Sequence, residues 1–553
     1  AKLNVGNAKV KKTSSNPTVT DGNASYSFVI FYHYIARINR RQQMGLRLYN
    51  TMGRTMQDFK PITPGFAGFY GCGPTVYNYA HIGNLRAYVF LDTLDRTLTF
   101  LGYDKKHVMN ITDIGHLTGD ADAGEDKMLK TAQERHESVL EVAKFYTDAF
   151  FKDLDGLNII RPDVVCKATE HVPDMIELIK RIEANGHTYM AGGNLYFDVS
   201  TFPDYGKLAN INLDDLKAGA RIDVDQNKRS PYDFVLWFTK SKFENQALTW
   251  DSPWGRGYPG WHIECSAMSM KYLGEHFDIH TGGIDHIPIH HTNEIAQSEG
   301  ATGHKWVNYW LHNEFLVIAK DKKAAEEGEG AKMSKSSGNF LTLQSLIDKG
   351  YNPLDYRFFL LGGHYRKQIY FSYDAMDGAK NARQALVQRV AKIAQSAGGI
   401  SALNAEKTYK KGEAADCSGL SQKAAEYINE FKVAIENDLS TPVAMSRLQK
   451  CVKDQSLEPS EALELIRRMD SVTGLALVKS AAALLKETPA CNGTVAVSHE
   501  GDSEAAEIDA LVKERTEAKK ARDFARADEI RRNLDARGVV VTDTPNGPVW
   551  ERK

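Results

Sequence analysis

Apolar and polar positions alternate with the spacing of strands and helices between residues 66 and 150. FAGFYGCG, residues 66–73, is a short apolar and aromatic run that ends in glycine, which predicts a buried strand. NLRAYVFLDTLDRTLTFLGY, residues 84–103, is amphipathic and predicts a helix, and KKHVMNIT, residues 105–112, predicts a second strand. A strand, a glycine-rich turn, a helix and a strand form a βαβ unit, and this unit predicts a parallel sheet.

The same alternation returns between residues 275 and 345. HFDIHTGG (276–283) and NEFLVIA (313–319) are the strand candidates, and a helix is predicted between them around HTNEIAQSEG. The stretch between the two regions, about 140–255, carries its own helices and turns. We therefore predict a Rossmann-like α/β domain over residues 44–370 with a parallel sheet that is split by this insertion.

From about residue 371 the apolar residues recur at steps of three and four, which predicts helices. We predict a helical-bundle domain over residues 371–480 and a linker over residues 481–504, where the residues are small, polar and weakly patterned. Residues 505–553 predict a small C-terminal module. It contains one helical and locally basic stretch, the strand-like VVVTDT, a turn at PNG, and VWERK.

Composition narrows the class of protein without naming a function. A chain of 553 residues is too long for one core and predicts two to four domains. The formal net charge is -2, so any contact with nucleic acid must depend on local basic patches. The six cysteines lack the spacing of a disulfide framework, which favours reduced thiols in a cytosol-like compartment. No apolar run approaches the roughly 18 residues that a membrane span needs.

Residues 1–43 differ from the rest of the chain, and the fold argument excludes them. Their basic residues stand against one acid, Asp21, and an apolar run at residues 28–35 precedes three arginines. A basic and acid-poor segment is typical of an organellar presequence. The alternative, which we favour, is a leader upstream of a start at Met44. We accordingly expect a cytoplasmic protein, with an organellar location as the alternative.

The segment HIGN, residues 81–84, predicts a phosphate-binding turn. It follows a strand and a glycine turn and opens a helix, whose first N–H groups and partial positive charge attract phosphate. Gly83 removes a side chain where a nucleotide approaches closely, and His81 and Asn84 can donate hydrogen bonds to phosphate oxygens. A four-residue match arises by chance, and a lone histidine is more often structural, so this segment alone decides little.

A second candidate lies far downstream in AKMSKSSGNF, residues 331–340. Lys332 and Lys335 flank Met333 and Ser334 in a loop rich in glycine and serine, which suits charge that develops on phosphate oxygens. Either lysine by itself would be an ordinary surface residue. In this order, on either side of an α/β insertion, the two segments resemble the HIGH-type and KMSKS-type signatures of class I aminoacyl-tRNA synthetases. Asparagine in place of the last histidine, as at position 84, is usual in the cysteinyl members.

Four scattered residues are candidates for a metal site: Cys72, Cys265, His290 and Glu294. His290 and Glu294 are four residues apart, so a helix directs both side chains to one place. Two thiolates, an imidazole and a carboxylate together suit zinc. An ordinary exposed helix face explains the histidine and the glutamate equally well. The ligands lack the CxxC spacing of a structural finger, which favours a functional metal that the fold gathers.

From about Met44 to its end the chain resembles the cysteinyl-tRNA synthetase family. The resemblance rests on the motifs CGPTVYNYAHIGN, NITDIGH, GWHIECSAM, HTGGIDHIPIHHTNE, AKMSKSSGN and RADEIRRNLDARGVVVTD. It implies one zinc ion per chain, which is held by the residues that match Cys72, Cys265, His290 and Glu294 and which binds the substrate's thiolate. Since four protein ligands usually close a structural zinc site, the substrate must enter as a fifth ligand or displace one.

Zinc is a sound way to recognise cysteine. A thiol with a pKa near about 8.5 loses its proton to a metal far more readily than a serine hydroxyl does, and thiolate is also the softer ligand. A pocket that used size alone would separate near-isosteres only about 10²-fold. The resemblance accordingly implies a synthetase without an editing site.

The resemblance also implies the residues around both substrates. The cysteine pocket would be lined by Thr112, Trp261, His280 and Asp285, with Asp285 as the partner of the substrate ammonium. ATP, with Mg²⁺ as its counter-ion, would be bound by Gly73, His81, Gly83, Asn84, Gly282, Gly283, Lys332, Ser334 and Lys335. WLHNEFL, residues 310–316, matches a region that packs on adenine, but Glu314 stands where many relatives have glycine, and its role stays open. The charged segment 320–330 is predicted to be a solvated flap.

The implied activity is that of a monomeric ligase that activates L-cysteine with ATP and transfers it to the 3′ end of tRNA(Cys). His81, Asn84, Lys332 and Lys335 would be its catalytic residues. The C-terminal module would read the anticodon through a basic stretch at residues 513–532, with Trp550 as a candidate for stacking on a base.

Two alternatives stay open at this point. A related ligase could join activated cysteine to an amino-sugar acceptor, but the long helical region and the tail argue against it. A non-catalytic protein descended from a synthetase is the other alternative. The presence of both signatures and of all four zinc positions argues against it.

Overall fold

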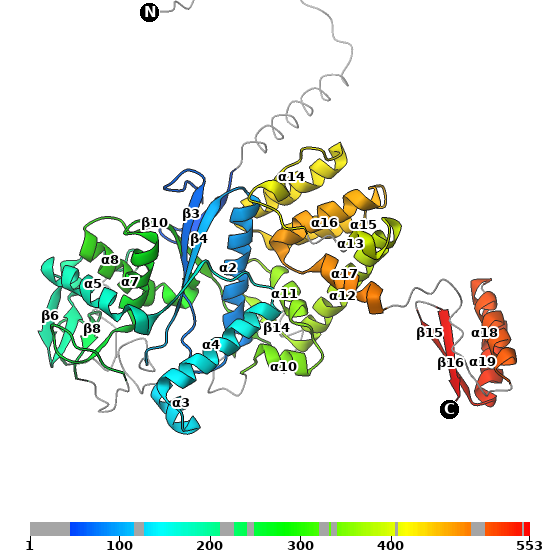
Figure 1. Ribbon diagram of the computed structural model, residues 1–553, viewed down its shortest axis with the longest axis horizontal. Coiled ribbons are helices and arrows are strands. Elements are labelled where there is room, and N and C mark those ends of the chain that lie inside the picture. Colours follow the sequence, from blue (N-terminus) through cyan, green and yellow to red (C-terminus); the bar gives the residue numbers. More distant parts are fainter. Residues whose placement is uncertain are drawn as a thin grey trace, which may run out of the picture. The chain divides into compact units, whose positions relative to one another are not determined.

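The structure is a computed structural model, and it divides into two compact units, residues 1–484 and 485–553. It describes residues 45–115, 127–210, 226–240, 248–319, 331–332, 340–403, 407–487, 504–521, 523–544 and 547–552 (Figure 1). The predicted extension at residues 1–43 and the flap at residues 320–330 lie outside these ranges. The domain boundaries predicted at residues 370 and 480 both fall inside the first unit and stay predictions.

A five-stranded parallel sheet forms the centre of the first unit. Its strands, in spatial order, are β11 (Val307–Asn313), β10 (Phe277–Gly283), β3 (Phe66–Gly71), β4 (Asp104–Ile111) and β5 (Val164–Lys167). The chain runs outward from β3 to β5 and then returns to place β10 on the other side of β3. The carboxyl ends of β3 and β10 therefore flank a switch point in the strand order, which is where ligands bind in open α/β sheets.

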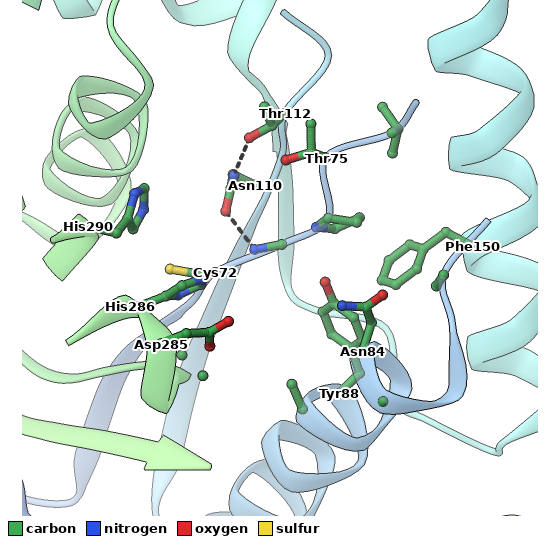
Figure 2. A pocket seen from close by; sticks show the side chains of 18 of the residues that line it. Cys72, Thr75, Asn84, Tyr88, Asn110, Thr112, Phe150, Asp285, His286 and His290 are labelled. Carbon is green, nitrogen blue, oxygen red and sulfur yellow. Dashed lines mark hydrogen bonds between the residues drawn. The ribbon is translucent and has the colours of Figure 1, made fainter. Parts of the chain in front are cut away.

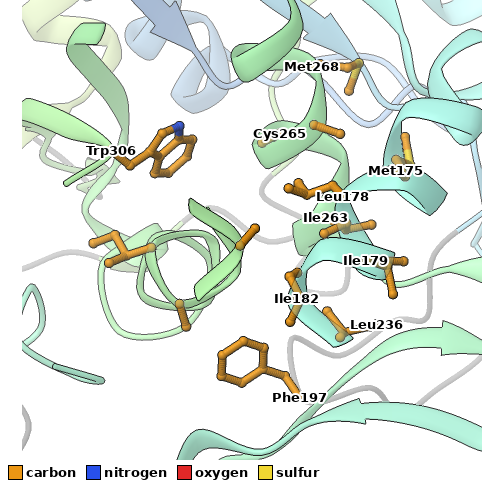
Figure 3. Packing of buried hydrophobic residues seen from close by; sticks show 14 of the residues in the cluster. Met175, Leu178, Ile179, Ile182, Phe197, Leu236, Ile263, Cys265, Met268 and Trp306 are labelled. Carbon is orange, nitrogen blue, oxygen red and sulfur yellow. The ribbon is translucent and has the colours of Figure 1, made fainter. Parts of the chain in front are cut away.

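Helices cover both faces of this sheet (Figure 1). α2 (Ile82–Phe100) packs against β4 and β10, and α7 (Trp261–Leu273) packs against β3 and β4. Behind α7 lie α5 (Val172–Ala184) and α8 (His290–Thr302), which contact α7 and each other. Figure 3 shows the main apolar cluster of this region, in which α5 and α7 interdigitate through Met175, Leu178, Ile263 and Met268. This packing fixes α7 and α8, which carry three of the four predicted metal ligands.

The parallel sheet confirms the predicted fold class, but two details of the prediction are wrong. The strand beside β10 is VNYWLHN, not NEFLVIA, because polar residues at positions 308, 312 and 313 interrupt its apolar run and hid it in the sequence. Of the predicted strand only β12 (Leu316–Ile318) forms. It belongs to a separate sheet with β13 (Ala331–Lys332) and β14 (Ile369–Phe371).

The insertion also begins later than predicted. α4 (Val139–Gly156) connects to β5, and β5 is the outer strand of the parallel sheet, so residues 139–167 belong to the Rossmann-like fold. The inserted part is an antiparallel sheet made of β6 (Thr188–Ala191), β7 (Asn194–Phe197), β8 (Phe234–Phe238) and β9 (Tyr258–Pro259). α3 (Lys127–Arg135) precedes α4, and a hairpin of β1 (Arg47–Asn50) and β2 (Thr55–Asp58) opens the described chain.

The helical pattern predicted after residue 371 is confirmed. Its helices are α12 (Tyr373–Ser396), α13 (Ile400–Leu403), α14 (Gln422–Glu436), α15 (Thr441–Lys453), α16 (Pro459–Thr473) and α17 (Leu477–Glu487). Two further helices precede them, α10 (Leu343–Asp348) and α11 (Pro353–Leu361). α16 packs against α2, so the helical region is continuous with the Rossmann-like fold. Within the described residues, no helix combines the length and the apolar character that crossing a lipid bilayer requires.

The C-terminal unit folds around a small core of its own. The predicted single helical stretch is two helices, α18 (Ala505–Lys520) and α19 (Phe524–Ala536), because Asp523 caps α19 by accepting the backbone N–H of Arg526. β15 (Val539–Thr544) and β16 (Gly547–Arg552) form an antiparallel pair, as VVVTDT and the turn predicted.

The prediction that Trp550 stacks on a base is wrong. Its side chain is 7% exposed, it packs against Ile508 and Ile530, and its indole N–H donates to Asp509 at 2.7 Å.

Candidate functional site

A cavity of about 370 Å³ opens at the carboxyl ends of the parallel strands. Residues that follow β3, β4, β10 and β11 line it, together with the start of α2, the start of α7 and parts of α3 and α4. Figure 2 shows that Cys72, Asp285, His286 and His290 lie on one side of the cavity and Asn84 lies on the other side. The residues predicted to bind a metal and those predicted to bind phosphate therefore face one space.

The turn after β3 is held by the neighbouring strands. The backbone N–H of Cys72 donates to the carbonyl of Thr281 on β10 at 3.3 Å, and that of Gly73 donates to Oδ1 of Asn110 on β4 at 2.7 Å. A Cβ atom on Gly73 would overlap the carbonyl oxygen of Asn110, so this position must be glycine. The glycine is thus required by the packing of the protein itself, and it fixes the direction in which Cys72 points.

His81 and Asn84 cap the helix that follows. Nδ1 of His81 accepts the backbone N–H of Asn84 at 3.0 Å, and Oδ1 of Asn84 accepts the backbone N–H of His81 at 3.2 Å. This reciprocal capping box satisfies two N–H groups of the helix start. In the neutral imidazole it places the ring proton on Nε2, since Nδ1 is the acceptor. Nε2 of His81 and the side-chain NH₂ of Asn84 are then hydrogen-bond donors at a helix N-terminus that lines the cavity.

The four predicted metal ligands come together. Ligand atoms of Cys72, Cys265, His290 and Glu294 all lie within 4.8 Å of one another, although the residues belong to three separate segments. Nε2 of His290 lies 2.7 Å from Oε1 of Glu294, which is 0% exposed. One turn of α8 separates the two residues, as the spacing predicted.

A second group of possible ligands overlaps the first. Cys72, His280, His291 and Glu294 also satisfy the same distance limit. Three residues of the first group line the cavity, whereas His280, His291 and Glu294 do not. A metal that must meet a ligand in the cavity therefore fits the first group better. His280 and His291 lie on the side of the site that faces the protein interior.

Buried side chains orient the ligands of the first group. Nδ1 of His290 is hydrogen-bonded to Nδ1 of His262 at 2.9 Å, which leaves Nε2 directed at Glu294. The other carboxylate oxygen of Glu294 lies 2.8 Å from Nε2 of His280. Partners of this kind fix the ring orientation and the tautomer of metal-binding histidines.

A chain of hydrogen bonds leads from Cys72 to the first hairpin. Sγ of Cys72 lies 3.3 Å from Nε2 of His291, Nδ1 of His291 lies 2.8 Å from Nε2 of His312, and Nδ1 of His312 lies 2.7 Å from Oγ1 of Thr51. His291 is 0% exposed and His312 is 6% exposed. Each ring nitrogen in the chain has a partner, as a buried polar network requires.

The electrostatics of the group separate the two thiols. Burial opposes ionisation of Cys72, but the hydrogen bond with Cys265 and the nearby His291 hold the pKa of Cys72 well below its usual range. The neighbouring Cys72 and burial raise the pKa of Cys265. Burial also opposes protonation of His290, but the Glu294 carboxylate outweighs it and raises the pKa of His290 to about 10. The two buried thiols therefore do not ionise independently, because a charge on one opposes a charge on the other.

The structure places three of the four predicted cysteine-pocket residues at the cavity. Thr112, Trp261 and Asp285 line it, and the ring of Trp261 lies 4.4 Å from that of His290 between centroids. His280 does not line the cavity. It is 0% exposed and stacks on Trp310, because its position inside β10 turns its side chain toward the interior. The prediction that His280 lines the pocket is wrong, and its contact in the structure is with Glu294.

The predicted nucleotide residues are only partly described. Gly73, His81, Gly83, Asn84, Gly282 and Gly283 line the cavity. Lys332 lies in β13, and its backbone pairs with that of Val317 in β12, while Ser334 and Lys335 lie outside the described residues. Glu314 also lines the cavity, and its carboxylate accepts the backbone N–H of Phe315 at 3.0 Å.

Sequence reasoning missed several residues of the site. Asn110 bridges Gly73 and Thr112 (Figure 2). Thr112 in turn donates to the buried carboxylate of Glu264 at 2.7 Å. The roles of His262 and His291 were also missed. A signal for His291 was present in composition, since four of the chain's 17 histidines stand between residues 280 and 294. The aromatic residues Tyr79 and Tyr146 at the cavity were not singled out either.

Comparison with known proteins gives two family matches. The family model described as "tRNA synthetases class I (C) catalytic domain" matches residues 58–381, and that described as "Cysteinyl-tRNA ligase anticodon binding domain" matches residues 502–550. Cysteine--tRNA ligase of Treponema denticola is 57% identical over 511 residues, covering 92% of this chain and 100% of the relative. Cysteine--tRNA ligase of Treponema pallidum (strain Nichols) is 48% identical over 527 residues with the same coverage.

Solved structures support the fold. The ternary complex of LeuRS, tRNA and LeuAMS from Agrobacterium radiobacter K84 aligns with a TM-score of 0.51 at 12% identity, covering 85% of this chain and 89% of that chain. At this identity the likeness concerns the fold alone. The family matches and the two relatives carry the assignment: this chain belongs to the cysteinyl-tRNA synthetase family of class I aminoacyl-tRNA synthetases.

Proposed function

We propose that this chain is a cysteine–tRNA ligase that forms cysteinyl-adenylate from L-cysteine and ATP and transfers the cysteinyl group to the 3′ end of tRNA(Cys). One observation carries the proposal. A group of two thiols, an imidazole and a carboxylate shares a single cavity with a capped helix N-terminus. The first is suited to a thiolate and the second to phosphate, so the cavity can hold the two reactants end to end.

The residues of the first group fit a zinc ion. Glu294 is a fully buried carboxylate, and in the described part of the chain its ion-pair partners are the histidines His280 and His290. A buried carboxylate surrounded by thiols and imidazoles is stabilised by a cation. Two sulfur ligands with one nitrogen and one oxygen ligand are typical of zinc. A bound zinc ion supplies a Lewis-acidic position that prefers the thiolate of cysteine over the hydroxyl of serine.

The residues beside this group orient the rest of the amino acid. The ring of Trp261 packs beside that of His290 and gives the cavity an apolar wall next to this group. The carboxylate of Asp285 is the proposed partner of the substrate ammonium (Figure 2). With the thiol and the ammonium held, the substrate carboxylate is directed toward the start of α2. This positioning makes the reaction of the substrate carboxylate with ATP effectively unimolecular.

At the other end, His81 and Asn84 stabilise the phosphates of ATP with N–H donors at the helix start. Lys332, Ser334 and Lys335 are proposed to join them, and Mg²⁺ accompanies the nucleotide. An oxygen of the substrate carboxylate bonds to the α-phosphorus while the bond from that phosphorus to the bridging oxygen breaks, and pyrophosphate leaves. The carboxylate is already ionised, so no protein nucleophile is needed. A ribose hydroxyl of the tRNA 3′ end then attacks the carbonyl carbon, the bond from that carbon to the phosphate oxygen breaks, and AMP leaves while the hydroxyl proton is released.

A ligase that uses an amino-sugar acceptor is the second candidate, since it needs the same first step. The match of residues 502–550 to an anticodon-binding model favours tRNA as the acceptor. Within the described part of the C-terminal unit, Phe524 is the exposed aromatic side chain, at 63%. We propose Phe524, in place of Trp550, as the aromatic contact with the anticodon.

Two assays on one preparation test the proposal. Pyrophosphate exchange into ATP should depend on cysteine and should not be supported by serine, and purified protein should charge tRNA(Cys). Cys265→Ala should lose exchange at low cysteine concentration. Exchange without charging would point to another acceptor. Robust exchange by Cys265→Ala at low cysteine would refute the role of the thiol group.

A further inference from the structure

We propose that Tyr79, Phe145, Tyr146 and Arg135 form a stacking shelf at the mouth of the cavity, on which the unpaired 3′-terminal nucleotides of the tRNA lie during transfer. The proposal rests on the proposed function, because it assigns the surface that the second substrate crosses. We call these four residues the shelf.

The shelf joins two segments that are distant in the sequence. Tyr79 lies in the loop between Cys72 and His81, whereas the other three residues belong to α3 and α4. The ring of Tyr79 meets that of Tyr146 at 5.1 Å and 89°, and that of Phe145 at 6.0 Å and 73°. The guanidinium carbon of Arg135 lies 4.3 Å from the centroid of Phe145. The four side chains therefore form one continuous aromatic and cationic surface.

This surface is exposed in a way that packing alone does not explain. Tyr79 is 43% exposed and Phe145 is 39% exposed, while Tyr146 is 7% exposed and lies beneath them. Among the described residues, the large aromatic side chains with comparable exposure are Tyr79, Phe145, Tyr373 and Phe524. Isolated exposed aromatics are ordinary. Here two of the four touch each other across separate segments, and they do so beside the active-site cavity.

The shelf continues the wall of the cavity. Tyr79 and Tyr146 line the cavity together with Cys72 and His81, and Phe145 is the outward neighbour of Tyr146. The adenylate forms inside this cavity, so the reacting ribose of the tRNA must enter it. The nucleotides behind that ribose are single-stranded and have exposed base faces. An exposed aromatic surface at the entrance can hold such faces without reading their sequence.

The charges around the shelf favour bases over phosphates as the contact. Nε and a terminal nitrogen of Arg135 bind the two carboxylate oxygens of Glu137 at 3.0 and 3.1 Å. The net charge of this pair is zero, so it attracts phosphate weakly, while the planar guanidinium keeps its stacking face. A protein partner would need a much larger interface than four side chains supply. Single-stranded nucleic acid can bind to the shelf through base stacking on these few side chains.

The test compares charging with adenylate formation in Phe145→Leu, which keeps an apolar side chain but removes the aromatic face. The ratio of kcat/KM for tRNA charging to kcat/KM for pyrophosphate exchange should fall about tenfold, mostly through KM for tRNA. Phe145→Trp should restore the ratio. Tyr373→Leu is the matched control. Tyr373 is 36% exposed, and Nζ of Lys349 lies 4.6 Å from the centroid of its ring, but Tyr373 does not line the cavity. Its ratio should stay within about twofold of the unaltered protein, since it loses no contact with the tRNA end.

A direct readout uses a tRNA(Cys) transcript with a fluorescent base analogue in place of the nucleotide that precedes the 3′-terminal one, which is the position that the shelf would contact. Stacking quenches this fluorophore, so binding to the unaltered protein should lower its emission, and Phe145→Leu should abolish that change. Equal quenching by both proteins, or an unchanged charging ratio in Phe145→Leu, would overturn the shelf. A failure of the unaltered protein to exchange or charge at all would instead refute the proposed function.

Discussion

The two ends of the cavity are built in opposite ways. The thiol end draws Cys72, Cys265, His290 and Glu294 from three segments and holds them by buried contacts to further histidines. The phosphate end is four consecutive residues, 81–84, that cap their own helix. One end depends on the whole fold, while the other is a local motif that any suitably placed helix could carry. We expect mutations at the thiol end to affect both metal binding and stability, and those at the phosphate end to affect chemistry.

The largest effect should come from breaking the thiol end. Cys265→Ser keeps the size of the side chain but replaces a soft ligand by a hard one, so zinc affinity should fall. We expect kcat/KM for cysteine in pyrophosphate exchange to fall by about 10³-fold or more, beyond the roughly 10–100-fold typical of residues that only orient a ligand. Zinc content after dialysis, measured together with exchange, checks this.

Cys166→Ser is the matched control for that change. Cys166 is 2% exposed and lies in β5 of the parallel sheet, but it is not part of the metal group. Its variant should keep both zinc and exchange. If Cys265→Ser also kept its zinc and its affinity for cysteine, the thiol end would have another role.

Changing the phosphate end should lower the rate of pyrophosphate exchange by a smaller factor and should leave the zinc content unchanged. Asn84→Ala removes one half of the capping box and a donor at the helix start, so kcat for exchange should fall on the order of 10²-fold. Zinc content and KM for cysteine should change little. Glu141→Ala is the matched control, because it removes the same half of the capping box of α4, where Ser138 is the N-cap.

Both variants should lose about 1 kcal/mol of the free energy of unfolding, since each loses one capping interaction. Only Asn84→Ala should lose activity. Equal activity of the two variants would show that Asn84 is a structural cap.

The contrast between the two ends also decides what the sequence could predict. The apolar period of residues 84–103 and the strand pattern at 105–112 predicted α2 and β4, and the local motif at residues 81–84 predicted the helix start. The thiol group could be predicted by residue type and by resemblance, but its spacing alone left an exposed helix face as an equal alternative. Only the fold brings the three segments together.

The errors have one physical source. β11 was missed because polar residues interrupt it, and two of them, His312 and Asn313, occur where the strand meets the site. His280 was placed in the pocket although its position in β10 directs it inward. Trp550 was assigned to a base although it completes the small core of the C-terminal unit. In each case contacts with residues distant in the sequence determine the structure, and the local sequence pattern does not reveal such contacts.

An intermediate effect should follow from cutting the hydrogen-bond chain behind Cys72. His312→Phe keeps an aromatic ring at this position but leaves Nδ1 of His291 without its partner, so the ring that contacts Cys72 is no longer held. Zinc affinity should fall about 10–100-fold, and the free energy of unfolding should fall by about 1–3 kcal/mol. Competition with a chelator measures the first quantity, and urea unfolding measures the second.

His171→Phe separates these two effects. His171 is 3% exposed and is hydrogen-bonded to Lys167 and Tyr272, away from the metal group. It should lose a similar stability and retain full zinc affinity. A loss of zinc affinity in both variants would attribute the effect to general destabilisation.

The smallest effect on catalysis should come from a change at Thr112, which lies between the thiol end and the phosphate end of the cavity. Oγ1 of Thr112 donates to Glu264 at 2.7 Å and accepts from Asn110 at 3.0 Å, and Asn110 holds the turn that carries Cys72 toward His81. Thr112→Val removes both bonds while keeping the shape, so KM for cysteine should rise by about 2–10-fold, as expected for the loss of single hydrogen bonds. Thr112→Ser keeps the hydroxyl and should stay close to the unaltered protein in pyrophosphate exchange. If the valine variant raised KM for ATP and left KM for cysteine unchanged, Thr112 would support the phosphate end, and the division of the cavity would have to be redrawn at this residue.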